Sequence, residues 1–161
     1  MGNDVQLVKM AEIGVAENST HLKTTLGSCV GLILHDPKRS ISGLAHIVLP
    51  RKIRADGAVG KYADTAVPAL LSEMVRRGSS PSELKAYLTG GARMFPFSGD
   101  RRLTSIGHLN VEAVKTILEE LRIRLTFVDT GGELGRTIVF KNLTGEILVT
   151  TLNRTGDGEK R

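Results

Sequence analysis

Cys29 and His46 are the two residues of this chain whose types and spacing favour covalent chemistry. Cys29 is the only cysteine, and a turn signal, His35-Asp36-Pro37-Lys38-Arg39, lies midway between it and His46. Asp followed by Pro is typical of a type I turn. A turn centred between Pro37 and Lys38 pairs Cys29 directly with His46 across two antiparallel strands, with Cβ atoms roughly 4.5–5.5 Å apart. A thiol beside an imidazole is the minimum that a thiol hydrolase requires.

Both residues also have a purely structural interpretation. A lone cysteine in a strand more often packs in the core than reacts. A histidine between Ala45 and Ile47 can likewise be a core residue with one hydrogen bond. His35, in the turn, and His108, before a helix, lack a partner comparable to the cysteine.

Three features near Cys29 favour the chemical interpretation. Small residues leave space for a ligand to approach the backbone, and these are Gly27, Ser28 and Gly31. His46 faces the cysteine in the predicted register. Thr24 and Thr25 lie just upstream, where a hydroxyl can orient the imidazole as the third member of a triad.

Length and composition limit the remaining possibilities. A chain of 161 residues that is 40% hydrophobic is expected to form one globular domain. It has no apolar run long enough to span a membrane and no secretory signal pattern. One cysteine leaves a free thiol, which fits a reducing cytoplasm, and the four histidines show no metal-ligand spacing. We therefore expect a cytoplasmic protein without a metal.

The basic charge of the chain raises the question of an acidic partner. The net charge is +5, but only 4% of residues are aromatic and tryptophan is absent, which disfavours nucleic acid. The loop from Pro50 to about Lys61 begins just after His46 and carries Arg51, Lys52 and Arg54. These three cations are candidates for contacting an acidic substrate at the rim of the site.

The periodicity of the chain predicts an α+β fold with packed, mixed sheets flanked by helices. Residues 29–34 and 41–48 form a hairpin that is apolar on both faces, so both faces of its sheet should be covered. Two helices are expected, 66–77 with Thr65 as N-cap and Pro68 at its third position, and 111–121 with Asn110 as N-cap. Other extended segments are 5–15, 85–89, 124–128, 137–140 and 146–152, giving six or seven strands.

The ends of the chain and one loop complete this picture. Residues 1–152 form a single domain, and 153–161 are predicted to be a polar, disordered tail. The glycine-rich segment from Asp129 to Arg136 resembles a phosphate loop, but no helix and no Lys-Ser/Thr pair follows it. We interpret it as a tight connection between strands that lines a site.

Motifs along nearly the whole chain resemble those of the chemoreceptor glutamine deamidase family, CheD, of bacterial and archaeal chemotaxis. They run in order over about residues 5–152: LGSCVGL around Cys29, GLAHIVLP around His46, KYADTAVPAL, LTGGARMF, IGHLNVEAVKTIL, FVDTGGELGR and VFKNLTGEI. The resemblance implies a cysteine hydrolase that converts receptor glutamines to glutamates, in some members with activity on glutamyl methyl esters. It also implies a fold like the catalytic domain of cytotoxic necrotizing factor toxins, and no cofactor.

The resemblance also implies roles for individual residues. Its Cys–His–Thr triad falls on Cys29, His46 and Thr24, with Thr25 as the alternative because family members often have a residue or two more before LGSC. Backbone N–H groups around Ser28 and Cys29 are candidates for binding the oxyanion, and Gly27 and Ser28 are candidates for contacting the substrate. The expected partners are the cytoplasmic helices of chemoreceptors and the phosphatase CheC. Two alternatives stay open: an adaptor that binds receptors or CheC without catalysis, and a thiol amidase for small amides.

Overall fold

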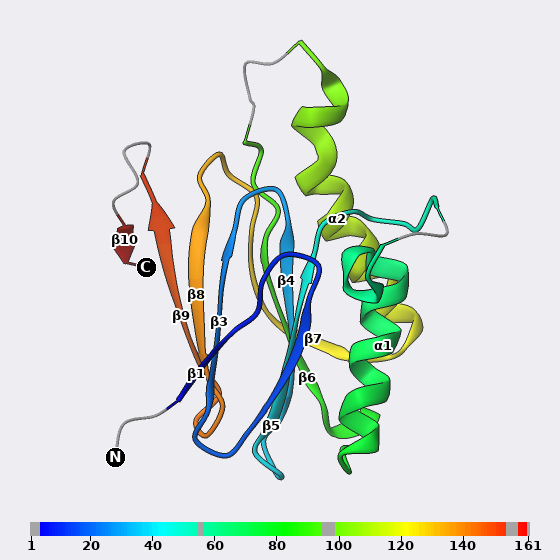
Figure 1. The fold of residues 1–161 in the computed structure, drawn as a ribbon, viewed down its shortest axis with the longest axis vertical. Coiled ribbons are helices and arrows are strands. Elements are labelled where there is room, and N and C mark those ends of the chain that lie inside the picture. Colours follow the sequence, from blue (N-terminus) through cyan, green and yellow to red (C-terminus); the bar gives the residue numbers. More distant parts are fainter. Residues whose placement is uncertain (1–3, 55–56, 95–98, 154–157, 161) are drawn as a thin grey trace.

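The protein is built in three layers, two β-sheets and one layer of helices (Figure 1). The structure is a computed structural model that describes residues 4–54, 57–94, 99–153 and 158–160, without the side chains of 101–104 and 158–160. Both sheets are mixed, because β1 pairs with β3 and β6 with β7 in parallel while the other pairs are antiparallel. The predicted α+β class with mixed sheets flanked by helices is confirmed.

Each sheet has five strands, more than the sequence predicted. Sheet A contains, in spatial order, β1 (Val5–Leu7), β3 (His21–Leu26), β8 (Arg136–Lys141), β9 (Glu146–Leu152) and β10 (Gly158–Lys160). Sheet B contains β2 (Ile13–Glu17), β5 (Ile41–Ile47), β4 (Val30–Asp36), β6 (Lys85–Gly90) and β7 (Arg124–Thr130). The extended segment predicted for residues 5–15 is split between the two sheets by the bend at 8–12, which accounts for one extra strand.

Sheet B is the middle layer and separates two apolar cores. β4 and β5 are buried along their whole length, which confirms that both faces of the hairpin are covered. One core lies between the sheets and includes Leu26, Ile33 and Phe140. The other lies between sheet B and the helices and includes Leu32 and Leu70. The inner face of sheet B therefore points toward β3, and its outer face toward the helices.

Helix α1 (Ala63–Arg76) begins three residues earlier than predicted. Thr65 is not its N-cap, because its hydroxyl donates to the carbonyls of Val59 and Tyr62 at 2.6 and 3.2 Å rather than accepting from a backbone N–H. Tyr62 occupies the cap position, and Pro68 lies inside the helix. Two short 3-10 helices, Val59–Lys61 and Pro81–Glu83, flank α1 in the sequence.

Helix α2 (Arg101–Glu120) has 20 residues and begins ten residues before the predicted helix 111–121. Asn110 was expected to cap it but lies near its middle. Gly107 of α2 allows close packing: a Cβ there would collide with the carbonyl oxygens of Gly91 and Ala92. None of the helices in the described residues is both long and apolar enough to cross a membrane.

The C-terminal segment departs in part from the predicted disordered tail. Gly158–Lys160 form β10, an edge strand paired with residues 150–152 of β9. Residues 154–157 and 161 lie outside the described residues. Backbone pairing with β9 holds residues 158–160 although their sequence is polar.

His35, near the end of β4, is a buried histidine with an unusual titration. It is 3% exposed, neither ring nitrogen has a hydrogen-bond partner within the described residues, and its ring meets the Phe140 ring edge-on at 5.0 Å. Burial lowers the pKa of His35 to about 4, with Asp36 opposing and Lys85 adding to the shift. Between pH 6.5 and about 4 the unfolded chain therefore binds a proton that the folded chain does not, so stability is lost as pH falls through this window.

Replacing His35 with phenylalanine is expected to reduce this acid sensitivity. The midpoint of thermal unfolding, compared at about pH 7 and about pH 5, should fall by about 3–6 °C more in the parent protein than in His35→Phe. Above pH 7 the two proteins should respond to pH alike. A fall of the same size in both would assign the effect to other groups, such as His46, whose pKa is also lowered.

Candidate active site

His46 lies on β5 and points into the space between the two sheets. Both of its backbone polar groups are hydrogen-bonded to the segment before β2. The His46 N–H donates to the Glu12 carbonyl and the His46 carbonyl accepts from the Ala11 N–H, each at 3.0 Å. The side chain is 4% exposed. Its Nδ1 lies 2.7 Å from the hydroxyl oxygen of Thr24 on β3. The imidazole thus bridges the gap from sheet B to sheet A.

Thr24 determines which nitrogen of His46 carries the proton. Its hydroxyl donates to the carbonyl of Val8 at 2.6 Å, and a hydroxyl has only one proton to give. In the contact with His46, the Thr24 oxygen must therefore accept a hydrogen bond that Nδ1–H donates. This tautomer leaves the Nε2 lone pair of His46 free to accept a proton.

Thr25, the alternative to Thr24, lies on the opposite face of β3. Its hydroxyl is 2.9 Å from that of Thr137 on β8, in an exposed position. Successive residues of a strand alternate between faces, so only one of the two threonines can meet His46. The structure brings Thr24 to the histidine and leaves Thr25 outside.

Cys29 is not directly opposite His46, and the predicted register is wrong by two residues. His46 pairs with Gly31, and the connecting loop contains four residues, 37–40, rather than two. The Asp36 carboxylate accepts the N–H groups of Lys38 and Arg39 at 3.1 and 3.2 Å, and Ser40 adopts a left-handed φ of 53°.

A shift by two residues keeps both side chains on one face of the sheet. Cys29 lies in a bend that immediately precedes β4, just outside the β4–β5 pairing. The thiol belongs to the core between the sheets, on the same side as Thr24 and His46. The three residues therefore share one buried space.

The segment that carries Cys29 is held by the end of β6. The carbonyl of Cys29 accepts from the Gly91 N–H at 2.8 Å, and that of Gly27 accepts from the Ala92 N–H at 2.9 Å. Gly90 has a φ of +96°, and a Cβ there would collide with the Cys29 carbonyl. This close approach of the two backbones requires glycine. Gly27 and Ser28, predicted to contact the substrate, are therefore fixed beside the thiol.

Burial keeps both reactive groups neutral at rest. It raises the pKa of the Cys29 thiol, and the residue's own backbone N–H offsets only part of that effect. Burial also lowers the pKa of His46, against the opposing influence of the Val8 backbone and the Glu12 carboxylate. At neutral pH the site thus holds a thiol and an imidazole rather than a thiolate–imidazolium pair.

The predicted basic residues lie on the loop that follows β5. Arg51, Lys52 and Arg54 are exposed, and the Lys52 backbone N–H donates to the Asp64 carboxylate at 3.0 Å. Arg51 lines an apolar groove of about 440 Å³ whose far wall is formed by Leu109, Ala113 and Ile117 of α2. The structure does not bring these cations into the space that holds Cys29 and His46.

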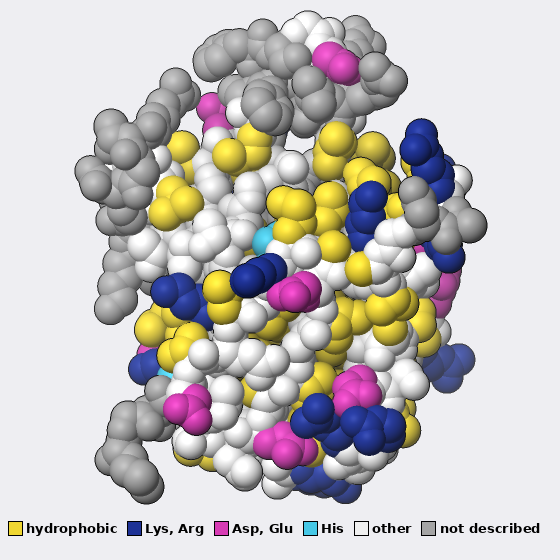
Figure 2. All heavy atoms as spheres, viewed as in Figure 1, with side chains coloured by type: hydrophobic (Ala, Val, Ile, Leu, Met, Phe, Trp, Pro, Cys, Tyr) yellow, Lys and Arg dark blue, Asp and Glu magenta, His cyan; other side chains and the backbone are white. Residues whose placement is uncertain are grey.

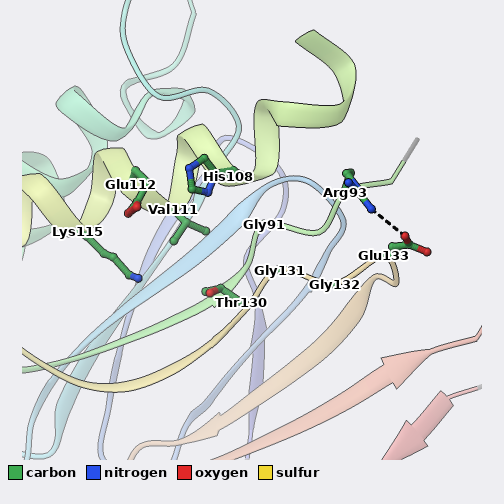
Figure 3. Close-up of a pocket in the computed structure, with 10 residues that line it drawn as sticks. All are labelled: Gly91, Arg93, His108, Val111, Glu112, Lys115, Thr130, Gly131, Gly132 and Glu133. Carbon is green, nitrogen blue, oxygen red and sulfur yellow. Dashed lines mark hydrogen bonds and ion pairs between the residues drawn. The ribbon is translucent and has the colours of Figure 1, made fainter. Parts of the chain in front are cut away.

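A second cavity of about 440 Å³ lies between α2 and the ends of β6 and β7 (Figure 3). His108, Glu112 and Lys115 project into it from α2, and Gly131 and Gly132 form its floor. Arg93 at its edge pairs with Glu133 at 3.0 Å. The glycine-rich segment is the tight connection that the sequence predicted, and it lines this cavity.

Buried Arg136 fixes that connection in place. Its guanidinium binds the carbonyl and carboxylate of Asp129 at 2.7 and 2.9 Å and also the carbonyl of Gly131. The Gly131 N–H in turn donates to the Gly90 carbonyl. Sequence analysis assigned no role to Arg136 and missed the Val8 carbonyl.

Among the residues described, no group of three His, Cys, Asp or Glu side chains is arranged to hold a metal ion.

Comparison with solved structures supports the fold. Neisseria meningitidis protein NMB0706, of the DUF152 family, is 10% identical with a TM-score of 0.53, and the match covers 80% of this chain and 64% of that one. Bacillus licheniformis YfiH is 15% identical with a TM-score of 0.50 and coverages of 73% and 49%. At these identities the likeness concerns the fold alone.

Comparison of sequences shows the family. Residues 48–151 match the family model described as CheD chemotactic sensory transduction. A Desulfitobacterium hafniense protein named "Probable chemoreceptor glutamine deamidase CheD" is 42% identical over 98% of both chains. A Halalkalibacterium halodurans protein named "Chemoreceptor glutamine deamidase CheD" is 41% identical, also over 98% of both. A Methanococcus vannielii relative is 42% identical over 88% of this chain and 92% of its own. The chain belongs to the CheD family.

Proposed function

We propose that this protein is a chemoreceptor glutamine deamidase that uses Cys29 as nucleophile, His46 as general base and Thr24 to orient the histidine. The observation that carries the proposal is the hydrogen-bond chain from His46 Nδ1 through Thr24 to the Val8 carbonyl. It leaves Nε2 available as a base in the buried space that the thiol shares. The names of relatives matched over 98% of the chain supply the substrate class.

Acylation begins when His46 Nε2 accepts the thiol proton while the sulfur attacks the carboxamide carbon of a glutamine side chain. The carbonyl oxygen becomes an oxyanion in the tetrahedral intermediate. The imidazolium then gives its proton to the departing nitrogen, which leaves as ammonia. A Cys29 thioester remains.

Deacylation uses the same histidine. Nε2 removes a proton from water, the oxygen attacks the thioester carbon, and the sulfur leaves and regains its proton from His46. The product is a glutamate side chain. A glutamyl methyl ester would react identically, with methanol in place of ammonia, so methylesterase activity is an extension of the same proposal.

The backbone at Ser28 and Cys29 is suited to bind the oxyanion. The carbonyls of Gly27 and Cys29 both accept hydrogen bonds from residues that follow β6. These two bonds fix the orientation of the peptide groups between them. The Cys29 backbone N–H partly offsets the rise that burial causes in the thiol pKa. An N–H next to the nucleophile is where an oxyanion develops, so we assign this role to the Ser28 and Cys29 amides.

The surroundings of the site favour a protein substrate over a small amide. Two exposed apolar side chains adjoin it: Met10 precedes Ala11, which bonds to the His46 carbonyl, and Met94 lies against Gly27. Figure 2 shows hydrophobic side chains gathered near the upper ends of the strands and α2, with basic side chains among them. Exposed apolar patches typically bind other proteins, whereas a small amide needs only the buried space.

The test is ammonia release from a purified receptor cytoplasmic fragment compared with free glutamine. We expect turnover of the fragment and none of the free amino acid at equal glutamine concentration. Comparable rates on both would favour the small-amide hydrolase instead. Binding of CheC and a cytoplasmic location stay predictions, the first measurable by titration with purified CheC.

Removing the three cations of the 51–54 loop is expected to weaken receptor recognition. In the triple variant Arg51/Lys52/Arg54→Ala, kcat/KM on receptor should fall at low salt and approach the parent value as salt rises, because screening removes the contribution of exposed charges. Single changes should have small effects, since exposed pairs contribute about 0.2–1 kcal/mol each.

A matched control removes three exposed cations at the opposite end of sheet B. Lys85, Arg122 and Arg124 lie there, and Lys85 and Arg124 are register partners. Their replacement by alanine changes the net charge equally, so it should leave kcat/KM near the parent value. Equal losses in both triple variants would show that total charge, rather than this loop, steers the receptor.

A further inference from the structure

Asn110 is a fully buried polar residue in the interior of α2. Its side chain is 0% exposed, and nine helical residues precede it. Asparagine is a poor residue for a helix interior, and a buried amide requires hydrogen-bond partners. Its presence there therefore calls for a specific interaction.

The amide nitrogen of Asn110 joins the two segments that carry the proposed nucleophile and base. Nδ2 donates to the carbonyl of Ser28 at 3.1 Å and to that of Val48 at 2.9 Å. Ser28 immediately precedes Cys29, and Val48 follows His46 by two residues. Oδ1 has no hydrogen-bond partner within the described residues, so the interaction is made by the nitrogen.

The register explains why an amide is needed at this point. The β4–β5 pairing ends at Val30 and Ile47, and before Val30 the chain turns to bond with Gly91 and Ala92. The carbonyl oxygens of Ser28 and Val48 then both lie within hydrogen-bond distance of Asn110 Nδ2. Two carbonyl oxygens cannot hydrogen-bond to each other, so each needs a donor. An Asn side chain offers two N–H donors from one nitrogen. Asn110 can therefore bridge the two carbonyls where the hydrogen bonds between β4 and β5 end.

We propose that Asn110 is a positioning residue that sets the distance between Cys29 and His46 from outside the active site. The inference rests on the proposed function. Thr24 fixes the histidine ring against sheet A, and Gly91 and Ala92 fix the Cys29 segment against β6. Asn110 ties the ends of β4 and β5 directly to each other where the backbone ladder stops. A misplacement of about 1 Å between reacting groups can lower a rate about 10²-fold.

The test uses Asn110→Leu, which keeps the branched arrangement of side-chain heavy atoms but removes both donors, and Asn110→Ala, which leaves room for a water molecule between the carbonyls. Val114→Ala is the matched control, because Val114 lies one turn further along α2, is 0% exposed and packs in the core between sheet B and the helices. Three quantities are measured for each: kcat and KM on the receptor fragment, the pH profile of Cys29 alkylation by iodoacetamide without receptor, and the midpoint of thermal unfolding.

We expect Asn110→Leu to lower kcat about 10- to 100-fold with KM changed less than about 3-fold. Its alkylation profile should move to higher pH, as for a thiol that has lost its base, and Asn110→Ala should show smaller shifts in the same directions. Val114→Ala should lower the unfolding midpoint without moving kcat or the alkylation profile. If the leucine variant does not fold, the alanine variant decides.

Parent-like kcat and alkylation in the Asn110 variants, with only a lowered unfolding midpoint, would overturn the inference and leave Asn110 a structural residue. Failure of the proposed function has a different signature. A parent protein that stays fully active after complete alkylation of Cys29 would overturn the nucleophile itself, and with it the role of Asn110.

Discussion

Replacing Cys29 with alanine is expected to reduce ammonia release from a receptor fragment by roughly 10⁴-fold or more, the scale on which loss of a catalytic nucleophile acts. The protein should remain folded, because the change removes one sulfur atom from the core between the sheets. The measurement is the turnover rate at saturating receptor, together with the midpoint of thermal unfolding.

Cys29→Ser is the companion variant, since it keeps the shape of the side chain but replaces the thiol by a weaker nucleophile. Both variants should still bind receptor, which separates catalysis from docking. Retained turnover in the alanine variant would exclude the proposed triad. Adaptation in cells that carry only the alanine variant would instead support the adaptor alternative.

Thr24→Val is expected to lower kcat on the order of 10²-fold, the lower range of general-base contributions. Valine has the shape of threonine without its hydroxyl, so the Nδ1–H of His46 loses its acceptor and the Val8 carbonyl its donor. The ring can then rotate or change tautomer, and Nε2 no longer faces the thiol as a base. The readouts are kcat and the pH dependence of iodoacetamide alkylation, which should shift to higher pH.

Thr25→Val is the matched control on the same strand. Its hydroxyl meets Thr137 on the other face of β3, so kcat should change less than about 2-fold, since surface substitutions have small effects. A large loss in Thr25→Val with a small one in Thr24→Val would reverse the assignment and contradict the geometry of β3.

The β4–β5 hairpin shows which structural features local sequence patterns can predict and which they cannot. Two apolar runs around Asp36-Pro37 predicted the strands, the burial of both faces and the pairing of a cysteine strand with a histidine strand. The register was missed by two residues because the loop conformation depends on Ser40 at positive φ, which its residue type does not favour. The error was harmless for the site because strand faces repeat every two residues.

Helix α2 shows where local signals mislead. Asn110 and Gly107 have the residue types of helix ends, but each is present for a contact with a segment distant in sequence. Gly107 allows the backbone at Gly91 to approach, and Asn110 bonds to Ser28 and Val48. Cap residues and tertiary contacts use the same side chains, so the sequence alone cannot separate them.

The choice between Thr24 and Thr25 required the partner sheet. The residues alone allowed either hydroxyl to orient the histidine, and only the packing of the two sheets shows that Thr24 faces His46 while Thr25 faces away from it. The Val8 carbonyl could not be found by inspection of residue types, because every residue at position 8 would supply the same oxygen.

The role of the Val8 carbonyl oxygen has a consequence for how the enzyme can be altered. The backbone that runs from β1 into Val8 is docked on β3 through the Val8 N–H, which donates to the Lys23 carbonyl at 2.9 Å. Because the proton on His46 is placed through a main-chain atom, the proposed chemistry depends on the backbone course of residues 4–8. Substituting side chains one at a time would not reveal such a dependence, whereas a fusion or deletion that displaces the Val8 carbonyl is expected to disable the proposed triad with its three residues intact.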